Sequence, residues 1–344
     1  MTFSEVARRF RKPWVMNLIP ISVIMAIGLA IPAWRVEATP AGQARARVGR
    51  AESSRPVTME RVGEGGQAAW IFTPNDPRPT TAPVILFIHG YRATDPYEYG
   101  AWIDHLVKRG NIVIYPIYEE EYGDSDPKIF RNLVEGSKTA INHLMTRGPV
   151  TPDLQRYAIV GHSFGGGLST VLAARAHEVG LPVPKAIMSV EPGWRDNGKF
   201  PTEYLDRIPP SVLLVVVEAD QDQFADSRQG STILSKTSQI PQSQKGYIRL
   251  QSNRESKLVA DHYAPLAPDE AYRLEHKTRR EERRERIVSK IMKIRDGEID
   301  ALDRNGFWKL FDALAEGAFR SQMNVDQIIR SGGTENMQVV APHN

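Results

Sequence analysis

One serine stands among four glycines in YAIVGHSFGGGL, residues 157–168. Ser163 follows an apolar run that predicts a buried strand over 156–161, and a helical pattern begins at the next residue. A strand that turns directly into a helix needs a very tight turn, and Gly161 and Gly165 lack the Cβ atoms that would collide there. The pattern predicts a sharp turn that presents the Ser163 hydroxyl as a nucleophile. A flexible glycine-rich loop is the other interpretation.

A serine hydroxyl is a weak nucleophile near neutral pH and requires a general base. G-x-S-x-G between a strand and a helix is the nucleophile elbow of α/β-hydrolases, in which an acid and then a histidine follow the serine along the chain. Only His262, His276 and His343 lie beyond the next strands. His276 falls in a charged helical run, and His343 lies in the C-terminal tail. His262, in VADHYAP, is therefore the predicted base.

The acid that orients this histidine is expected just after the apolar strand 211–217, where the sequence reads EADQDQF. Asp220 and Asp222 are both candidates. Asp222 is preferred, because many hydrolases show a small residue, two further residues and then the acid, and Ala219 provides the small residue. Asp220 is then expected to brace the loop. Glu191, at the end of the preceding strand, is a third and less favoured acid.

The tetrahedral intermediate of acyl transfer needs N–H donors for its oxyanion. The first predicted donor is the backbone N–H of Phe164, the residue after the nucleophile. The second is expected from the loop after the buried strand 83–89. There Gly90 lets the backbone turn toward the serine, so the N–H of Tyr91 is the predicted donor. His89 precedes the nucleophile in the chain and is interpreted as a brace for this loop.

These motifs, HGY, GHSFGG, the Asp220/Asp222 pair and DHY, together resemble an α/β-hydrolase over roughly residues 57–320. The resemblance is to the cap-poor branch that includes chlorophyllase-like enzymes, cutinase-like polyester hydrolases and platelet-activating-factor-acetylhydrolase-like enzymes. In the polyester hydrolases a Tyr or Phe after the glycine supplies an oxyanion N–H, which Tyr91 matches. Those enzymes also carry a Trp after the strand that follows the elbow. Trp194, shifted by one inserted glycine, is the corresponding candidate for a substrate wall.

Strands and helices alternate from residue 57 onward, which predicts an α/β fold with a mostly parallel central sheet and helices on both faces. An Arg-, Lys- and Glu-rich run predicts a charged helical insertion over 268–300. A helix over 306–319 is expected to close the domain, and 321–344 is expected to form a C-terminal tail. The predicted strands are 57–62 and 68–74 (an antiparallel pair), 83–89, 111–116, 156–161, 185–190, 211–217 and 247–251. The other predicted helices are 99–110, 129–147, 164–180 and 226–238.

The N-terminal region differs from the rest of the chain. Residues 14–33 carry no charge and follow a basic patch at Arg8–Lys12. This pattern is typical of an export signal or a single membrane anchor, so residues 1–34 predict a secreted, periplasmic or membrane-anchored protein. An Ala-, Arg- and Gly-rich linker is expected over 35–56. The basic patch accounts for the net charge of +3, so nothing indicates a nucleic-acid partner.

The 344-residue chain contains no cysteine, which excludes disulfides, thiolate nucleophiles and Cys-type zinc sites. It has no HExxH, no P-loop and no GxGxxG after a strand, so neither a metal nor another cofactor is predicted. Hydrolases often carry a lid between the strands predicted here at 185–190 and 211–217. Only residues 191–210 separate these strands, which predicts an active site that is open to solvent. The predicted function is hydrolysis of a small-molecule or polymeric ester through an acyl-enzyme. An acyltransferase and a non-catalytic hydrolase-fold binding protein are the alternatives.

Overall fold

The computed structural model of the chain describes residues 56–120, 124–194, 200–224, 228–274, 299–321, 324–332 and 337–339. Nine strands in these ranges form one sheet in the order β1-β2-β4-β3-β5-β6-β7-β8-β9. From β4 to β8 neighbouring strands run parallel, whereas β1–β2, β2–β4 and β8–β9 are antiparallel. The strands are β1 Val57–Val62, β2 Ala69–Pro74, β3 Thr81–Ile88, β4 Ile112–Pro116, β5 Thr151–His162, β6 Ala186–Val190, β7 Leu213–Ala219, β8 Lys245–Leu250 and β9 Met337–Val339.

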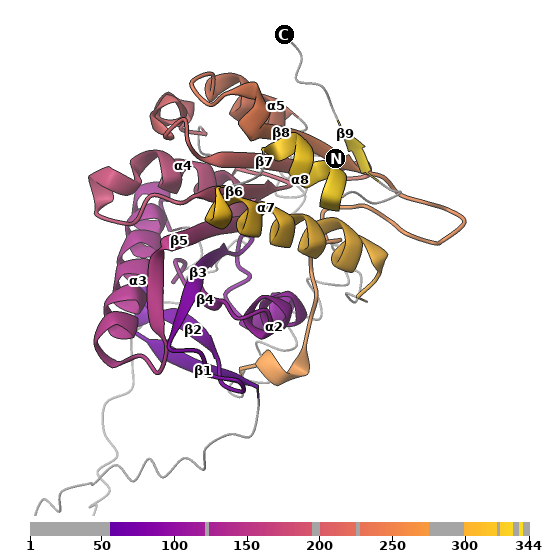
Figure 1. Cartoon of the computed structure of the whole chain (residues 1–344). Coiled ribbons are helices and arrows are strands. Elements are labelled where there is room, and N and C mark those ends of the chain that lie inside the picture. Colours follow the sequence, from indigo (N-terminus) through magenta and orange to yellow (C-terminus); the bar gives the residue numbers. More distant parts are fainter. Residues whose placement is uncertain are drawn as a thin grey trace, which may run out of the picture. The chain divides into compact units, whose positions relative to one another are not determined.

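Successive side chains of the central strands face opposite sides of the sheet, and both sides are buried. In β3, Val84, Leu86 and Ile88 join one apolar cluster, whereas Ile85 and Phe87 join the other. Helices α3, α4 and α5 cover the first face, and α2, α7 and α8 cover the second (Figure 1). This arrangement confirms the predicted α/β class. The helices are α2 Gly100–Lys108, α3 Asp126–Arg147, α4 Phe164–Val179, α5 Arg228–Lys236, α7 Lys309–Arg320 and α8 Val325–Gly332.

Two helices begin earlier than the sequence pattern predicts. Helix α3 starts at Asp126 instead of 129, with a proline in its first turn, where the missing N–H costs nothing. The helix expected over 306–319 is preceded by a π-helical turn, Leu302–Trp308, that runs directly into α7. Gly306 lies inside this turn because a Cβ there would come within 3.3 Å of Leu250, so the glycine serves close packing and does not mark a helix start.

The expectation of a C-terminal tail over 321–344 is wrong. This segment contains α8, whose Val325, Ile328 and Ile329 are buried on one face at helical spacing. Gly246 of β8 permits this contact, because a Cβ there would lie only 2.7 Å from Val325. Strand β9 then pairs antiparallel with β8 and extends the sheet. Helix α8 and strand β9 are short and contain few apolar residues, so their hydrophobic periodicity is weak. The sequence therefore predicts a tail in place of these two elements.

Several predictions fall on residues outside the described ranges. They include the apolar segment 14–33, the linker up to residue 55 and the central part, 275–298, of the charged insertion. Among the described residues, no helix combines the length and apolar character that a membrane span requires.

We predict that shortening the chain to end at Ser321 destabilises the domain more than shortening it to end at Gly332. The first variant loses α8 and β9, and each of its three buried aliphatic side chains contributes about 1.5–3 kcal/mol when removed from water. Of the described elements, the second variant loses the edge strand β9 and keeps α8. Thermal unfolding followed by circular dichroism measures both. Equal melting temperatures in the two variants would contradict the packing role of α8.

Candidate active site

The carboxyl ends of the parallel strands β3, β5, β6, β7 and β8 lie at one edge of the sheet, where open α/β sheets bind their ligands. The segments that follow these strands carry, in chain order, Tyr91, Ser163, Glu191, Asp222 and His262. All the residues predicted to carry out chemistry therefore come from this edge.

Ser163 has a backbone conformation that L-residues rarely adopt, with φ of 57° and ψ of −121°. The turn is so tight that a Cβ at Gly161 would collide with the carbonyl of Gly165, and a Cβ at Gly165 would collide with the carbonyl of Ile88. The Ser163 N–H donates to the carbonyl of Val190 at 2.9 Å and ties the turn to β6. The glycines are thus a requirement of a fixed turn and not the sign of a flexible loop.

His262 lies between Ser163 and Asp222, and both of its ring nitrogens are engaged. Nε2 is 2.8 Å from Ser163 Oγ, and Nδ1 is 2.8 Å from Asp222 Oδ2. A carboxylate only accepts, so Nδ1 carries the ring proton and Nε2 is left to accept from the serine hydroxyl. The structure therefore brings the three predicted side chains together in the order that lets the imidazole remove the serine proton.

The two neighbouring aspartates point in different directions. Asp222 Oδ1 accepts the backbone N–H of Phe224 at 2.8 Å, which holds its other oxygen against His262. Asp220 Oδ1 accepts both the N–H and the hydroxyl of Ser252, at 3.1 and 2.7 Å. Asp220 therefore braces the loop after β8, as expected, and Asp222 alone of the pair contacts the histidine.

Backbone groups of two loops lie next to the nucleophile. Gly90 sits so close that a Cβ on it would be 3.4 Å from Ser163 Cβ, and Phe164 begins helix α4 directly after the serine. The Tyr91 ring packs edge-on against Phe164 at 6.1 Å. Gly193 was not predicted. Its N–H donates to the Ser163 carbonyl at 2.9 Å, and a Cβ there would be 3.6 Å from Ser163 Oγ, so glycine leaves room for an acyl group.

The loop after β3 is braced on several sides. The His89 ring stacks on Tyr118 at 4.1 Å, and its Nδ1 donates to the carbonyl of Gly90 at 2.7 Å. The Arg92 N–H donates to Glu119 at 2.6 Å. Burial lowers the pKa of His89 to about 3, so this histidine stays neutral and holds the loop without exchanging protons.

Aromatic side chains flank the serine and the histidine. Trp194 packs against Phe164 at 5.0 Å and against Phe200 at 5.3 Å, so it borders the elbow on the side of β6. Phe224, which the sequence analysis missed, lies 5.5 Å from the His262 ring and 5.4 Å from Tyr263. It is 40% exposed, an unusual value for phenylalanine, and provides an apolar surface beside the histidine.

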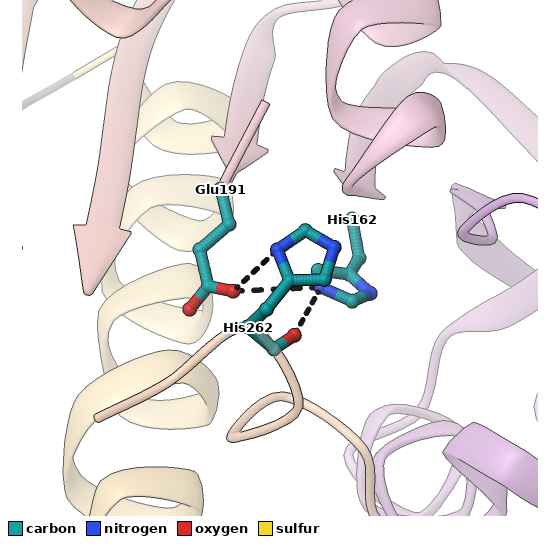
Figure 2. Close-up of side chains that lie close together, drawn as sticks. All are labelled: His162, Glu191 and His262. Carbon is teal, nitrogen blue, oxygen red and sulfur yellow. Dashed lines mark hydrogen bonds and ion pairs between the residues drawn. The ribbon is translucent and has the colours of Figure 1, made fainter. Parts of the chain in front are cut away.

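Glu191 is a second carboxyl group against the same histidine (Figure 2). It is fully buried, and Oε2 lies 3.5 Å from His262 Nδ1 and 3.6 Å from His162 Nε2. Neither of its oxygens has a hydrogen-bond partner among the described residues. Burial, reinforced by the charge of Asp222, raises the pKa of Glu191 well above its usual range. The raised pKa favours the neutral, protonated form of Glu191, and Asp222 is the carboxyl group within hydrogen-bond distance of His262 Nδ1.

His162, Glu191 and His262 place one possible metal-ligand atom each within 4.8 Å of one another. A metal requires a free lone pair on each ligand nitrogen. His262 Nδ1 carries a proton directed at Asp222, and His162 Nε2 lies 2.9 Å from the His262 carbonyl, to which it can only donate. Both nitrogens are thus used as donors, so this arrangement does not fit a metal. A separate cavity of about 330 Å³ lies at the opposite end of β3, between α2 and α7, and includes none of these residues.

A sequence comparison finds that the family model described as Chlorophyllase matches residues 42–217. The match includes Ser163 and ends before Asp222 and His262. No curated protein compared with the chain is significantly similar in sequence. Among solved structures, a tryptophan-to-histidine variant of the esterase rPPE has a TM-score of 0.43 and 18% identity, over 57% of this chain and 73% of that chain. A serine-to-alanine, tryptophan-to-histidine double variant of the same esterase has a TM-score of 0.42 and 16% identity, over the same shares.

We predict that Glu191→Gln raises the melting temperature at pH 7 by about 2–4 °C or more. The raised pKa means that folded Glu191 keeps a proton that the unfolded chain releases above its ordinary pKa of 4.5. Its contribution to stability is therefore complete below pH 4.5 and is lost as the pH rises from there toward the folded-state pKa. An amide takes up no proton on folding and escapes this loss. Melting curves from pH 4 to pH 8 measure the difference, which should shrink toward pH 4.

Glu203→Gln, on the exposed surface, is the matched control and should leave the pH dependence unchanged. A Glu191→Gln variant whose stability follows the wild-type pH curve would mean that Glu191 is ionised in the folded protein.

We predict that Asp222→Asn lowers kcat far more than Asp220→Asn. Only Asp222 accepts the Nδ1 proton of His262, and loss of such a carboxylate can reduce kcat by ~10⁴-fold because the histidine takes the wrong tautomer. Initial rates on a p-nitrophenyl ester measure both variants. Comparable losses of kcat in the two variants, or a larger loss in Asp220→Asn, would show that Asp222 is not the orienting acid.

Proposed function

The chain belongs to the chlorophyllase family of ester hydrolases, and on this basis we propose that it cleaves carboxylic esters through a covalent acyl-enzyme on Ser163. His262 is the proposed general base and Asp222 the group that orients it. One observation carries the proposal: both ring nitrogens of His262 are engaged at 2.8 Å, one by the serine hydroxyl and the other by the aspartate. That geometry is what a serine nucleophile needs in order to be activated near neutral pH.

In the acylation half-reaction, Ser163 Oγ attacks the ester carbonyl carbon while His262 Nε2 takes the hydroxyl proton. The imidazolium that forms is stabilised by Asp222. The carbonyl oxygen becomes an oxyanion, for which the N–H groups of Tyr91 and Phe164 are the proposed donors. The start of α4 lies beside it and favours negative charge. When the intermediate collapses, the C–O bond to the alcohol breaks and Nε2 returns its proton to the leaving oxygen.

In the deacylation half-reaction, a water molecule takes the position of the alcohol. His262 removes one of its protons, the resulting hydroxide attacks the acyl carbon, and Ser163 leaves with the proton held on Nε2. The products are a carboxylic acid and an alcohol. Glu191 takes no part in these transfers as a base, because burial raises its pKa and so favours its protonated form.

Two further features support an ester substrate of appreciable size. Gly193 leaves space next to Ser163 Oγ, and the exposed Phe224 ring borders His262. Apolar surface on one side of a reactive serine favours an acyl or aryl group there. We propose that Trp194, which packs on Phe164, forms part of the opposite wall.

The charge-free segment 14–33 supports the further proposal that the enzyme acts outside the cytoplasm or at a membrane. Transfer of the acyl group to an alcohol other than water uses the same intermediate, so an acyltransferase is distinguished by its products and not by its nucleophile. Adding a primary alcohol to the assay and analysing products for a new ester separates the two reactions.

We predict that the wild-type enzyme hydrolyses p-nitrophenyl esters and that Ser163→Ala abolishes turnover. A fluorophosphonate probe should add one phosphonyl group to the wild-type enzyme at Ser163 and none to the variant, as read by intact and peptide mass spectrometry. Ser169→Ala, a buried serine on α4 that donates to a backbone carbonyl, is the matched control and should retain labelling.

Turnover that survives in Ser163→Ala would exclude the proposed mechanism. A folded wild-type protein that neither hydrolyses any ester of a chain-length series nor reacts with the probe would support the non-catalytic binding function instead.

A further inference from the structure

His162, the residue before the nucleophile, contacts the backbone of His262 (Figure 2) and reaches the loop after β3 through Tyr99. Its ring is buried, with Nδ1 2.8 Å from the Tyr99 hydroxyl and Nε2 2.9 Å from the backbone carbonyl of His262. The Tyr99 oxygen in turn accepts the Gly90 N–H at 3.0 Å. Tyr99 is fully buried as well, so these bonds are shielded from bulk solvent.

In this series of hydrogen bonds, each group can be assigned as donor or acceptor in only one consistent way. The His262 carbonyl can only accept, so His162 Nε2 carries the proton and Nδ1 of the neutral ring is an acceptor. Tyr99 therefore donates its hydroxyl proton to Nδ1 and accepts from Gly90. The result is an unbroken series from Gly90 through Tyr99 and His162 to the backbone of His262. Burial lowers the pKa of His162 to about 3, so the ring is neutral near pH 7 and the hydrogen-bond partners select this tautomer.

The two ends of the series, Gly90 and the backbone of His262, lie next to groups whose positions determine the rate of the proposed reaction. Gly90 precedes Tyr91, a proposed oxyanion donor, and its Cα lies against Ser163. His262 lies on the irregular segment after β8, which is also tied to the acid's loop by the Gln221 N–H to the Ala260 carbonyl at 2.9 Å. His162 is covalently adjacent to the nucleophile, so its ring fixes the oxyanion loop and the base relative to the serine.

We propose that His162 is a positioning residue that sets the distance of His262 from Ser163 through one nitrogen and the oxyanion loop, via Tyr99, through the other. This inference rests on the proposed serine-hydrolase function. A displacement of about 1 Å in such a group can cost about 10²-fold in rate, because the attack geometry is lost while the substrate still binds. The series should therefore act on kcat and leave KM largely unchanged.

Two near-isosteric variants separate the two bonds. His162→Gln keeps an N–H donor near the place of Nε2, whereas His162→Asn keeps a polar group near the place of Nδ1 and lacks the donor to His262. We expect His162→Asn to lower kcat by roughly 10–100-fold at unchanged KM and His162→Gln to recover most of that loss. Tyr99→Phe removes the hydroxyl that holds Gly90 and His162, so it should lower kcat by loosening the proposed oxyanion loop. Melting temperatures of all variants are measured alongside.

Two double variants test whether the link to Tyr99 and the link to His262 act separately. Tyr99→Phe and His162→Gln interrupt the same contact, so Tyr99→Phe/His162→Gln should be no slower than the slower single variant. Tyr99→Phe/His162→Asn removes both links and should show the product of the single losses. Equal losses in His162→Asn and His162→Gln that follow the melting temperature, or wild-type kcat in both, would overturn the inference. If either His162 variant fails to fold, the remaining His162 variant and Tyr99→Phe still test the positioning role.

Turnover by the wild-type enzyme and fluorophosphonate labelling of Ser163 are recorded in the same experiment. Their absence would refute the proposed function itself, whereas normal wild-type turnover with unaffected His162 variants would refute only the positioning role.

Discussion

The site depends on one backbone constraint, the positive φ of Ser163 at the end of β5. An L-residue in this conformation is strained, and it persists only where the surroundings hold it. Gly161 and Gly165 remove the side chains that would collide with the turn, and the bond from Ser163 N–H to Val190 anchors it to the next strand. Because strand and helix are both buried, the strained residue is held by rigid elements, and its hydroxyl lies 2.8 Å from His262 Nε2.

Burial then determines which groups near the serine carry charge. Four titratable side chains lie within a few ångströms: His162, Glu191, Asp222 and His262. Burial raises the pKa of Glu191, which favours its protonated form, and lowers the pKa of His162 to about 3, which keeps that ring neutral. Asp222 lies 2.8 Å from Nδ1 of His262, the ring nitrogen that carries the proton in the proposed mechanism. With Glu191 and His162 in their neutral forms, Asp222 is the carboxyl group that interacts most directly with His262.

Much of this arrangement is readable from the sequence, because it depends on local patterns. The elbow glycines and the apolar strands are short-range features that predict the sheet and Ser163. The order of serine, acid and histidine known from similar hydrolases then predicts His262 and the choice of Asp222 over Asp220. The contacts of Glu191 and Gly193 were not predictable in the same way. Both follow β6, and their roles depend on the register of β6 beside β5 and on a positive φ at Glu191, which no sequence pattern specifies.

The position of β9 in the sheet has a consequence for synthesis of the chain. Strand β8 ends at Leu250, but the strand that covers its outer edge begins only at Met337. At about 5–20 residues per second, a ribosome takes roughly 4 to 17 s to translate the intervening stretch. During that interval the outer edge of β8 presents unpaired N–H and C=O groups, the kind of edge on which foreign strands can add. The outer edge of β8 is therefore the last part of the described sheet to be paired as the chain is made.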